Sequence, residues 1–378
     1  MNLFDIVNSE FSNVFNREPA YVIRAPGRVN LIGEHTDYND GFVLPMAINR
    51  AMWIALRPRL DDRVLLHSLQ MHYPAEFDLG DIKHGTGWVE YVHGIAWSLI
   101  KDGYNLEGFE GVLSGDVPVG AGLSSSAALE MAAAKAFSLV SGWQFEPAVM
   151  ALAGQRAENQ WVGANTGIMD QMISASGKAG HALLLDCRDL STLHIPLPKN
   201  TVVVTMDTAT RHSHTDSGYN ERRLECETAA AHFGVSHLRD VSYERFQAGS
   251  GGLAENTLKR ARHVITENER VLQAAEALNA GDAVRMGQLM NASHISMRDD
   301  FEITNDELNI MVDLAQSQSG CYGARMTGGG FGGCAVAMVK TSAAKVFADK
   351  VAVEYQQKTG LEPKVYLSEA TNGAEVVN

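Results

Sequence analysis

The sequence has few cysteines and no long uncharged stretch, and these two features exclude different classes of protein. No Cys-x-x-Cys pair or zinc-finger spacing joins its four cysteines, so we expect free thiols and no disulfide framework. No uncharged stretch approaches the roughly 18 residues that span a bilayer, and an acid, Asp5, precedes any base at the N-terminus. We therefore expect a cytoplasmic protein that neither inserts into a membrane nor carries a secretory signal.

Basic residues are also scarce relative to acids. The chain has 31 Lys and Arg against 45 Asp and Glu, a formal net charge of −14. This balance argues against a general nucleic-acid surface, and an anionic substrate would need a local basic group. The remaining composition, 45% hydrophobic over 378 residues, is typical of a globular protein with two or three units and a sizeable core.

No repeat, coiled-coil heptad or Pro-rich linker marks a domain boundary, so the organisation is read from changes in pattern. A pair of prolines, Pro196 and Pro198, is the candidate junction between residues 1–198 and 199–378. Both halves mix β-branched runs with helix-favouring runs, which predicts an α+β fold of two domains. We expect strands at 21–25 (ending at Pro26-Gly27), 51–56, 64–67, 201–206, 334–339 and 364–367, and helices at 88–100, 126–140, 220–233 and 257–279.

The segment 120–128, Gly-Ala-Gly-Leu-Ser-Ser-Ser-Ala-Ala, is a glycine turn that opens a helix. Glycine permits close backbone approach, and the N-terminus of a helix offers unpaired N–H groups, so the segment can cradle an anion. Taken alone, a serine-capped helix after a tight turn explains it equally well. It is not a Walker loop, because Met172 and Ala179 flank the Gly177-Lys178 pair where Gly and Ser or Thr would stand.

Three further segments carry dense polar or glycine patterns. Residues 26–38 gather carboxylates, an amide and an imidazole in a short glycine-bounded region, which suits a polyol better than a random surface loop. Glu158 and Asp170 lie on either side of a glycine-containing loop, so one can hold a cation while the other meets a hydroxyl, although a helix-capping role for Asp170 stays open. Residues 328–333 contain five glycines, which indicates close packing against another loop or a phosphate. His212 and His214 beside Asp216 lack further ligands and carry little weight as a metal site.

Together these segments resemble the galactokinase branch of the GHMP small-molecule kinases. Residues 27–38 resemble the galactokinase signature, residues 120–126 the superfamily phosphate loop, and residues 325–333 its third motif. The order and spacing extend the resemblance from about Tyr21 to Val339. It implies a two-domain α+β GHMP kinase fold with the active site in the interdomain cleft and an unusual left-handed β-α-β connection in the first domain.

The resemblance also implies site residues. The catalytic pair would be Asp170, which accepts the hydroxyl proton, and Arg28, which favours the ionised carboxylate and stabilises charge at the transferring group. The sugar would be held by Glu34, His35, Thr36, Asp37, Gly167, Asp170 and Tyr219. The nucleotide would be held by Ser68 and Trp88 near the adenine and by Gly120, Ala121, Gly122, Leu123, Ser124, Ser125 and Ser126 around the phosphates, and Mg²⁺ by Ser126 and Glu158.

The implied activity is transfer of the γ-phosphoryl group of MgATP to the anomeric hydroxyl of α-D-galactose, the first step of galactose catabolism. Other readings are a galactokinase-like sensor that binds ATP and galactose without chemistry, and a kinase for arabinose or N-acetylgalactosamine. Asn165-Thr166 and the segment 211–214 depart from many relatives, which affects the expected breadth of sugars rather than the reaction class. The expected partners are small molecules only, and the chain is expected to be a monomer or a weak dimer.

Overall fold

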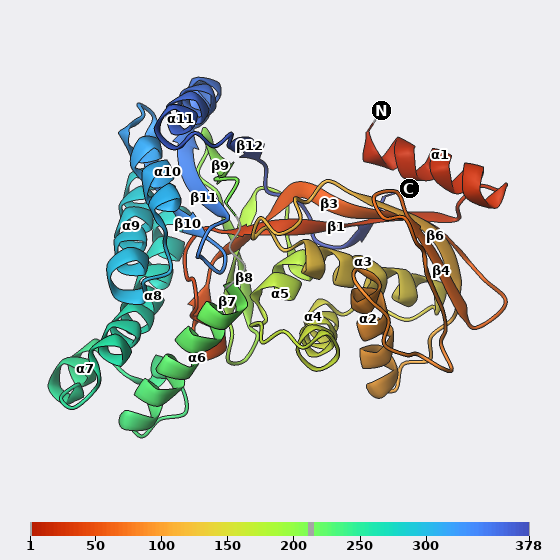
Figure 1. Ribbon diagram of the computed structural model, residues 1–378, viewed down its shortest axis with the longest axis horizontal. Helices are drawn as coiled ribbons and strands as arrows, with labels where there is room; N and C mark the ends of the chain where they lie inside the picture. The colour runs from red at the N-terminus through yellow and green to blue at the C-terminus, as the bar shows by residue number, and fades with distance from the viewer. Residues whose placement is uncertain (1, 211–214, 378) are drawn as a thin grey trace.

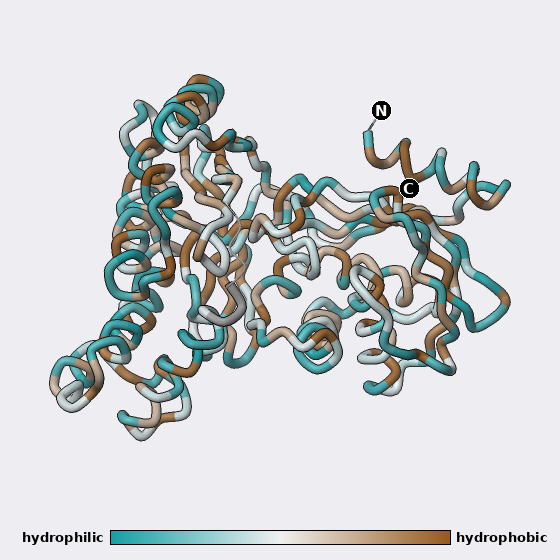
Figure 2. The backbone as a smooth tube through the Cα atoms, in the orientation of Figure 1, coloured by the Kyte–Doolittle hydropathy of each residue, from teal (hydrophilic) through white to brown (hydrophobic). Residues whose placement is uncertain are grey.

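The computed structural model describes residues 2–210 and 215–377, and Figure 1 shows them in two lobes, each a β-sheet with helices against it. The predicted two-domain α+β fold is confirmed. The predictions that concern His212, His214 and the rest of the segment 211–214 lie outside the described residues. In Figure 2 apolar stretches follow the strands and the inner sides of helices, as expected for two cores.

The first lobe is built on a six-stranded sheet with the order β13-β1-β3-β6-β4-β5. Strands β4 and β6 are parallel and the other neighbours are antiparallel, so the chain must cross over between β4 and β6, which it does through β5 and helix α2. The handedness of this connection stays a prediction. The strands are β1 (Tyr21–Asn30), β3 (Pro45–Pro58), β4 (Arg63–Ser68), β5 (Ala75–Asp78), β6 (Phe109–Gly115) and β13 (Glu375–Val376).

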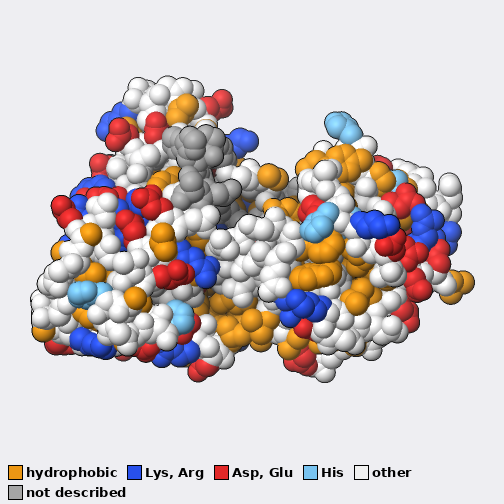
Figure 3. All heavy atoms as spheres, turned by 60° about the horizontal axis from the view of Figure 1, so that its bottom comes forward, with side chains coloured by type: hydrophobic (Ala, Val, Ile, Leu, Met, Phe, Trp, Pro, Cys, Tyr) orange, Lys and Arg blue, Asp and Glu red, His pale blue; other side chains and the backbone are white. Residues whose placement is uncertain are grey.

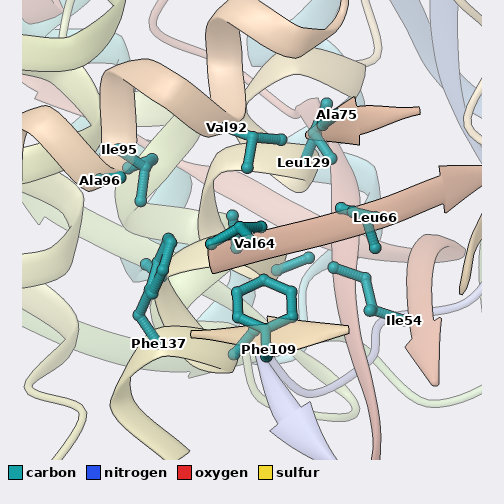
Figure 4. Close-up of a cluster of buried hydrophobic side chains, with 14 of the residues drawn as sticks. Ile54, Val64, Leu66, Ala75, Val92, Ile95, Ala96, Phe109, Leu129 and Phe137 are labelled. Atoms are coloured by element: carbon teal, nitrogen blue, oxygen red, sulfur yellow. The ribbon is translucent and has the colours of Figure 1, made fainter. Parts of the chain in front are cut away.

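Successive residues of β1 serve opposite faces of this sheet, because side chains alternate along a strand. Val22 packs with Val7 and Phe11 of helix α1, and Ile23 packs into the larger core under α2 and α3. Figure 4 shows part of that core, where the ring of Phe109 lies between Phe137 on one side and Ile54 on the other, next to Val64. The helices of this lobe are α1 (Leu3–Phe15), α2 (Val89–Lys101), α3 (Ser125–Val140), α4 (Pro147–Arg156) and α5 (Met169–Ser176), and a π-helical turn, η2 (Ala157–Val162), follows α4.

A three-stranded sheet with the order β2-β7-β8 completes the first half of the chain. Its strands are β2 (Phe42–Val43), β7 (His181–Asp186) and β8 (Thr192–Pro196). The 3-10 turn η1 (Asp37–Asn39) precedes β2, so this small sheet lies directly after the polar segment 26–38. No strand of this sheet was predicted from the sequence patterns.

The second lobe has a four-stranded antiparallel sheet with the order β10-β11-β9-β12 and a helical layer (Figure 1). The strands are β9 (Thr201–Asp207), β10 (Cys321–Thr327), β11 (Cys334–Lys340) and β12 (Lys364–Ser368). The helices are α6 (Thr215–His232), α7 (Tyr243–Gly249), α8 (Glu255–Asn279), α9 (Ala283–Ser296), α10 (Asp306–Ser317) and α11 (Ala344–Thr359), with short turns η3 (Leu238–Asp240), η4 (Met297–Phe301) and η5 (Thr341–Ala343).

One expectation about the first lobe needs correction. Strand β1 does not end at Pro26-Gly27 but continues to Asn30, because a bulge between Pro26 and Arg28 lets the strand keep its pairing with β3. Residues near 375 belong to the sheet of the first lobe, since β13 pairs with β1. A boundary at residue 198 therefore leaves one late strand on the other side.

Candidate active site

A cavity of about 530 Å³ lies between the two lobes. Residues of the first half form most of its wall, and the second half contributes Tyr219, Asn220, Gly328 and Gly329. Fourteen of the predicted site residues line it: Arg28, Glu34, His35, Asp37, Gly120, Gly122, Leu123, Ser124, Ser125, Ser126, Glu158, Gly167, Asp170 and Tyr219. The cavity thus brings together segments that are far apart in the sequence.

The phosphate-loop candidate ends at the first turn of α3. Gly120 and Gly122 have φ angles of 69° and 74°, the left-handed region that glycine adopts without strain. No acidic side chain stands in the first turn of α3, so nothing negative competes there for its free N–H groups. The loop also packs against the glycine-rich segment 328–333, since a Cβ on Gly328 would lie 3.1 Å from the Gly122 oxygen. The second glycine cluster therefore contacts another loop, one of the two roles expected for it.

Asp170 is held in the cavity by two neighbours. Arg28 donates from Nε to Oδ1 and from Nη2 to Oδ2 of Asp170, both at 2.7 Å, and Ser124 donates its hydroxyl to Oδ2. A third guanidinium nitrogen, Nη1, donates to the Gly122 oxygen at 2.6 Å. A bidentate pair of this kind fixes the plane of the carboxylate as well as its charge. Arg28 thus connects the carboxylate to the phosphate loop.

Glu34 lies at the end of a buried polar network. Its Oε1 accepts from the Gly328 N–H at 2.7 Å, and its Oε2 lies 3.2 Å from Arg325 Nη2 and accepts from the Asn30 amide. Burial raises the pKa of Glu34, and the charge of Arg325 is the largest effect that opposes this shift.

His35 is a neutral imidazole in an aromatic setting. Burial lowers its pKa to about 3, so it is uncharged at neutral pH. Nε2 lies 3.2 Å from the Gly329 carbonyl oxygen and Nδ1 lies 2.7 Å from the Tyr38 hydroxyl. A carbonyl can only accept, so Nε2 carries the hydrogen and Nδ1 accepts from Tyr38. The ring also lies 5.0 Å from that of Tyr219, centroid to centroid.

Asp37 and Gly167 contact one another closely. A Cβ on Gly167 would lie only 1.8 Å from Oδ2 of Asp37, so glycine is required for the carboxylate to stand where it does. Burial, followed by the charge of Asp170, raises the pKa of Asp37 to about 6.

Glu158 and Ser126 form the metal-site candidate. Glu158 lies in η2 and is buried, and its carboxylate is hydrogen-bonded to Ser126, Thr166 and Gln171. Burial and then the charge of Asp170 raise its pKa. Carboxylate and hydroxyl oxygens are ligands that suit Mg²⁺, which in kinases is bound through one or two protein carboxylates and the substrate phosphates. The donor set therefore fits the ion.

Four predicted residues do not line the cavity. Trp88 is 8% exposed and packs in the core of the first lobe, and Ala121 is fully buried in the core between the lobes. The buried Thr36 hydroxyl lies 2.9 Å from the Gly33 oxygen and 2.7 Å from the Phe42 oxygen, so it braces the turn. Ser68 ends β4 and its hydroxyl accepts from the Gln70 N–H at 3.3 Å. Thr36 and Ala121 thus support segments that line the cavity, and the nucleotide contacts of Ser68 and Trp88 stay predictions.

The sequence analysis missed several lining residues, among them Tyr91, Pro118 and Asn220. Tyr91 stands three residues after Trp88 in the helical pattern, so it lies about one turn along α2. That spacing was the available signal. Asn220 gives no local signal, because only the approach of α6 to the loop 163–167 brings it there, where Asn165 donates to it at 3.2 Å.

The charge of the cavity differs from that of the surface. Figure 3 shows basic and acidic side chains interspersed over one face of the molecule. Among the described residues that line the cavity, four are carboxylates (Glu34, Asp37, Glu158 and Asp170) and Arg28 is the only arginine or lysine.

The structure contains no helix, within residues 2–210 and 215–377, that is long and apolar enough to cross a membrane.

Family models match three parts of the chain. The galactokinase galactose-binding signature matches residues 9–58, the GHMP kinase N-terminal domain residues 90–178, and the GHMP kinase C-terminal domain residues 274–356. A galactokinase of Roseiflexus sp. is 43% identical over 97% of this chain and 95% of its own length. A galactokinase of Actinobacillus succinogenes is 46% identical over 96% of each chain.

Solved structures agree. A crystal structure of Lactococcus lactis galactokinase complexed with galactose has a TM-score of 0.94 at 35% identity and covers 99% of this chain and 100% of its own. A mevalonate kinase from Methanococcus jannaschii has a TM-score of 0.68 at 19% identity, covering 93% and 98%, which shows the shared fold alone. With near-complete coverage at well over 30% identity, the chain belongs to the galactokinase family of the GHMP kinases.

Proposed function

We propose that the protein, in this cavity, catalyses transfer of the γ-phosphoryl group of MgATP to the anomeric hydroxyl of α-D-galactose, giving galactose 1-phosphate and ADP. One observation carries this proposal: Arg28 fixes Asp170 in the cavity that is lined both by the phosphate-loop candidate, residues 120–126, and by Glu34 and Asp37. A hydroxyl hydrogen-bonded to Asp170 would thus lie beside the site of the phosphates. Membership in the galactokinase family supports the choice of acceptor.

The sugar would lie against Glu34, His35, Asp37, Gly167 and Tyr219. Glu34 and Asp37 can accept hydrogen bonds from sugar hydroxyls, and Gly167 leaves room for Asp37. His35 is committed at both nitrogens to Gly329 and Tyr38, so its contribution is to hold these neighbours and to offer a ring face. The arrangement favours a small polyol.

The ATP phosphates would lie at the N-terminus of α3, along Gly120 to Ser126. Free N–H groups and the positive end of the helix dipole stabilise negative charge there. The four carboxylates of the cavity oppose such a ligand, and Arg28 balances only one of them. Mg²⁺, held by Glu158 and Ser126, would neutralise the phosphates when bound.

In the transfer, the anomeric oxygen forms a bond to the γ-phosphorus, the bond from that phosphorus to the β,γ-bridging oxygen breaks, and ADP leaves. Asp170 takes the hydroxyl proton. Because Arg28 and Ser124 both bond the carboxylate, its main contribution is to orient the hydroxyl, and it accepts the proton late in a loose transition state. Arg28 also offers positive charge to the transferring group.

The test is phosphorus NMR of the protein with MgATP and D-galactose. A sugar-phosphate signal at the anomeric position that grows in step with ADP is the expected result. If ATP persists although both ligands raise the melting temperature, the protein is a sensor and the proposal fails. If galactose does not bind, the same assay with arabinose and N-acetylgalactosamine identifies another acceptor.

We also propose that the chain divides into two domains, residues 1–198 and 199–378, with β13 as a late contribution to the first sheet.

A cytoplasmic location is supported by the thiols, since all four cysteines are free: Cys187, Cys226 and Cys334 are buried and Cys321 is half-buried. A monomer or weak dimer is the proposed state, and light scattering at two concentrations tests it.

A further inference from the structure

A row of charged side chains, buried except for the half-buried Arg270 at its end, runs from the cavity wall into the second lobe. It consists of Glu34, Arg325, Glu267 and Arg270. Arg325 Nη2 lies 3.2 Å from Glu34 Oε2 and 3.9 Å from Glu267 Oε1, and Arg270 Nε donates to Glu267 Oε2 at 2.6 Å. The side chains of Arg325 and Glu267 are 0% exposed and that of Glu34 is 2% exposed. Neither the transfer step nor the phosphate site accounts for Arg325.

The two carboxylates depend on Arg325 to different degrees. Glu267 has other donors: the Gly33 N–H at 3.0 Å, the Ser293 hydroxyl at 2.5 Å and Arg270. Glu34 accepts hydrogen bonds from two neutral groups, the Gly328 N–H and the Asn30 amide, and Arg325 is its ion-pair partner. Arg325 is therefore the nearest positive charge to Glu34.

Arg325 itself has little else to hold it. Its Nη2 also donates to Met297 Sδ at 3.1 Å, while Nε and Nη1 have no hydrogen-bond partner among the described residues. A buried guanidinium without full hydrogen bonding is costly unless nearby carboxylates compensate its charge. An apolar residue would fill this place in β10 at lower cost. The presence of an arginine here thus indicates that Glu34 needs a positive charge beside it.

We propose that Arg325 is a positioning residue for sugar binding: its ion pair holds the carboxyl group of Glu34 at the cavity wall, where it can accept a hydrogen bond from a sugar hydroxyl. The proposal rests on the proposed function, in which Glu34 contacts the sugar. Arg325 lies behind Glu34 and does not line the cavity, so its effect on the substrate passes through Glu34.

The surroundings of Glu34 determine what loss of Arg325 does. Burial raises the pKa of Glu34, and Arg325, the Gly328 N–H and Arg28 lower it, in that order, while Glu267 raises it. Arg28 is already paired with Asp170. His263, whose Nε2 lies 3.2 Å from the Glu34 carbonyl oxygen, has a pKa lowered to about 4 by burial and is neutral. Asp37 adds negative charge nearby. Without Arg325, the pKa of Glu34 would therefore lie higher still, because the largest effect that opposes burial would be lost.

The test uses Arg325→Met, which keeps the length of the side chain and removes the charge. We expect the KM for galactose to rise about tenfold or more, since one charged hydrogen-bond acceptor is lost, while the KM for ATP stays unchanged. In this variant the rise of kcat/KM for galactose with pH should shift to higher pH than in the wild type. The double variant Arg325→Met/Glu34→Gln should regain thermal stability over Arg325→Met but not galactose affinity, because a neutral amide at position 34 needs no counter-charge and cannot accept a sugar hydroxyl as a carboxylate does.

A matched control separates this role from a general loss of stability. Arg260 is 1% exposed and also pairs with two carboxylates, at 2.9 Å from Glu225 and 2.8 Å from Glu302, neither of which lines the cavity. Arg260→Met should lower the melting temperature without a selective change in the KM for galactose. An equal rise in the KM for galactose in the control, or in the KM for ATP with Arg325→Met, overturns the proposal.

Two outcomes remain distinct. If the wild-type protein does not phosphorylate galactose, the proposed function fails. If the wild type is active and Arg325→Met binds galactose normally with a wild-type pH profile, only the role of Arg325 fails. Should Arg325→Met not fold, Arg325→Gln decides, because it also removes the charge but keeps a polar side chain in the site. A selective rise in the KM for galactose in that variant supports the proposal, and an unchanged KM refutes it.

Discussion

Replacement of Gly167 by alanine tests whether the position of Asp37 matters for the sugar. The new Cβ would lie 1.8 Å from Oδ2 and 2.2 Å from Cγ of Asp37, although real Cβ contacts essentially never fall below 3.0 Å. The carboxylate must therefore move by about 1 Å or more, and a displacement of that size in a binding group can cost about 100-fold in rate.

We expect Gly167→Ala to lower kcat/KM for galactose by about 100-fold while the KM for ATP stays unchanged. Thermal stability should change little, because Asp37 can turn into the cavity and gives up only its hydrogen bond from the Tyr38 N–H at 3.0 Å. The assay is ADP release with galactose varied at saturating MgATP, combined with a thermal melt.

The control is Gly251→Ala, where a Cβ would meet nothing within 4 Å and the backbone is not left-handed. It should behave as wild type or be slightly more stable. If Gly167→Ala keeps the wild-type kcat/KM for galactose, then Asp37 does not have to stand where the structure has it, and the reasoning about the sugar site is wrong.

Three further predictions concern single side chains. Asp170→Asn should fold and bind galactose but lose about 100-fold or more in turnover, since proton transfer is worth 10²–10⁴-fold, and near-normal phosphorus NMR time courses would rule out its role. Asp37 has a pKa raised from 3.8 to about 6, so the folded state holds its proton more tightly and stability falls as pH rises through about 6. Above that pH, Asp37→Asn should therefore have a free energy of unfolding up to about 3 kcal/mol larger than that of the wild type, at about 1.4 kcal/mol per pKa unit. The variant should nevertheless bind galactose less well. Identical melting curves of variant and wild type both below and above pH 6 would contradict this. Trp88→Phe should lower stability by about 1–2 kcal/mol through lost core packing, and the KM for ATP of this variant tests the predicted adenine contact, which an unchanged KM would refute.

Local patterns predicted the elements whose residues agree with their surroundings. The run from Ser126 to Val140 is rich in helix formers and also almost fully buried, so propensity and packing favour the same helix. β1 was cut short because Pro26-Gly27 is a turn signal in isolation. In the fold, Gly27 is required for another reason: a Cβ there would lie 2.6 Å from the Leu123 oxygen.

The site was predicted best where one segment carries several polar groups, as in residues 34–37. Contacts between distant segments could not be read from spacing. The sequence placed Arg325 in the glycine-rich third motif but predicted no role for it. In the structure it forms an ion pair with Glu34, which lies 291 residues earlier. The adenine contact of Trp88 is implied by the family resemblance alone and stays a prediction, while the structure shows the residue 8% exposed in the core of the first lobe.

The pairing of β13 with β1 affects the order in which the chain can fold during synthesis. Ile23 and Arg24 pair with Val376 and Glu375, so one edge of the first sheet has no partner strand until the ribosome has made almost all of the second lobe. An unpaired edge is a template for other strands, and contacts of such long sequence separation form slowly. The nascent first lobe must therefore persist with an open edge for most of its synthesis, a period in which chaperone capture or association between neighbouring nascent chains competes with native pairing.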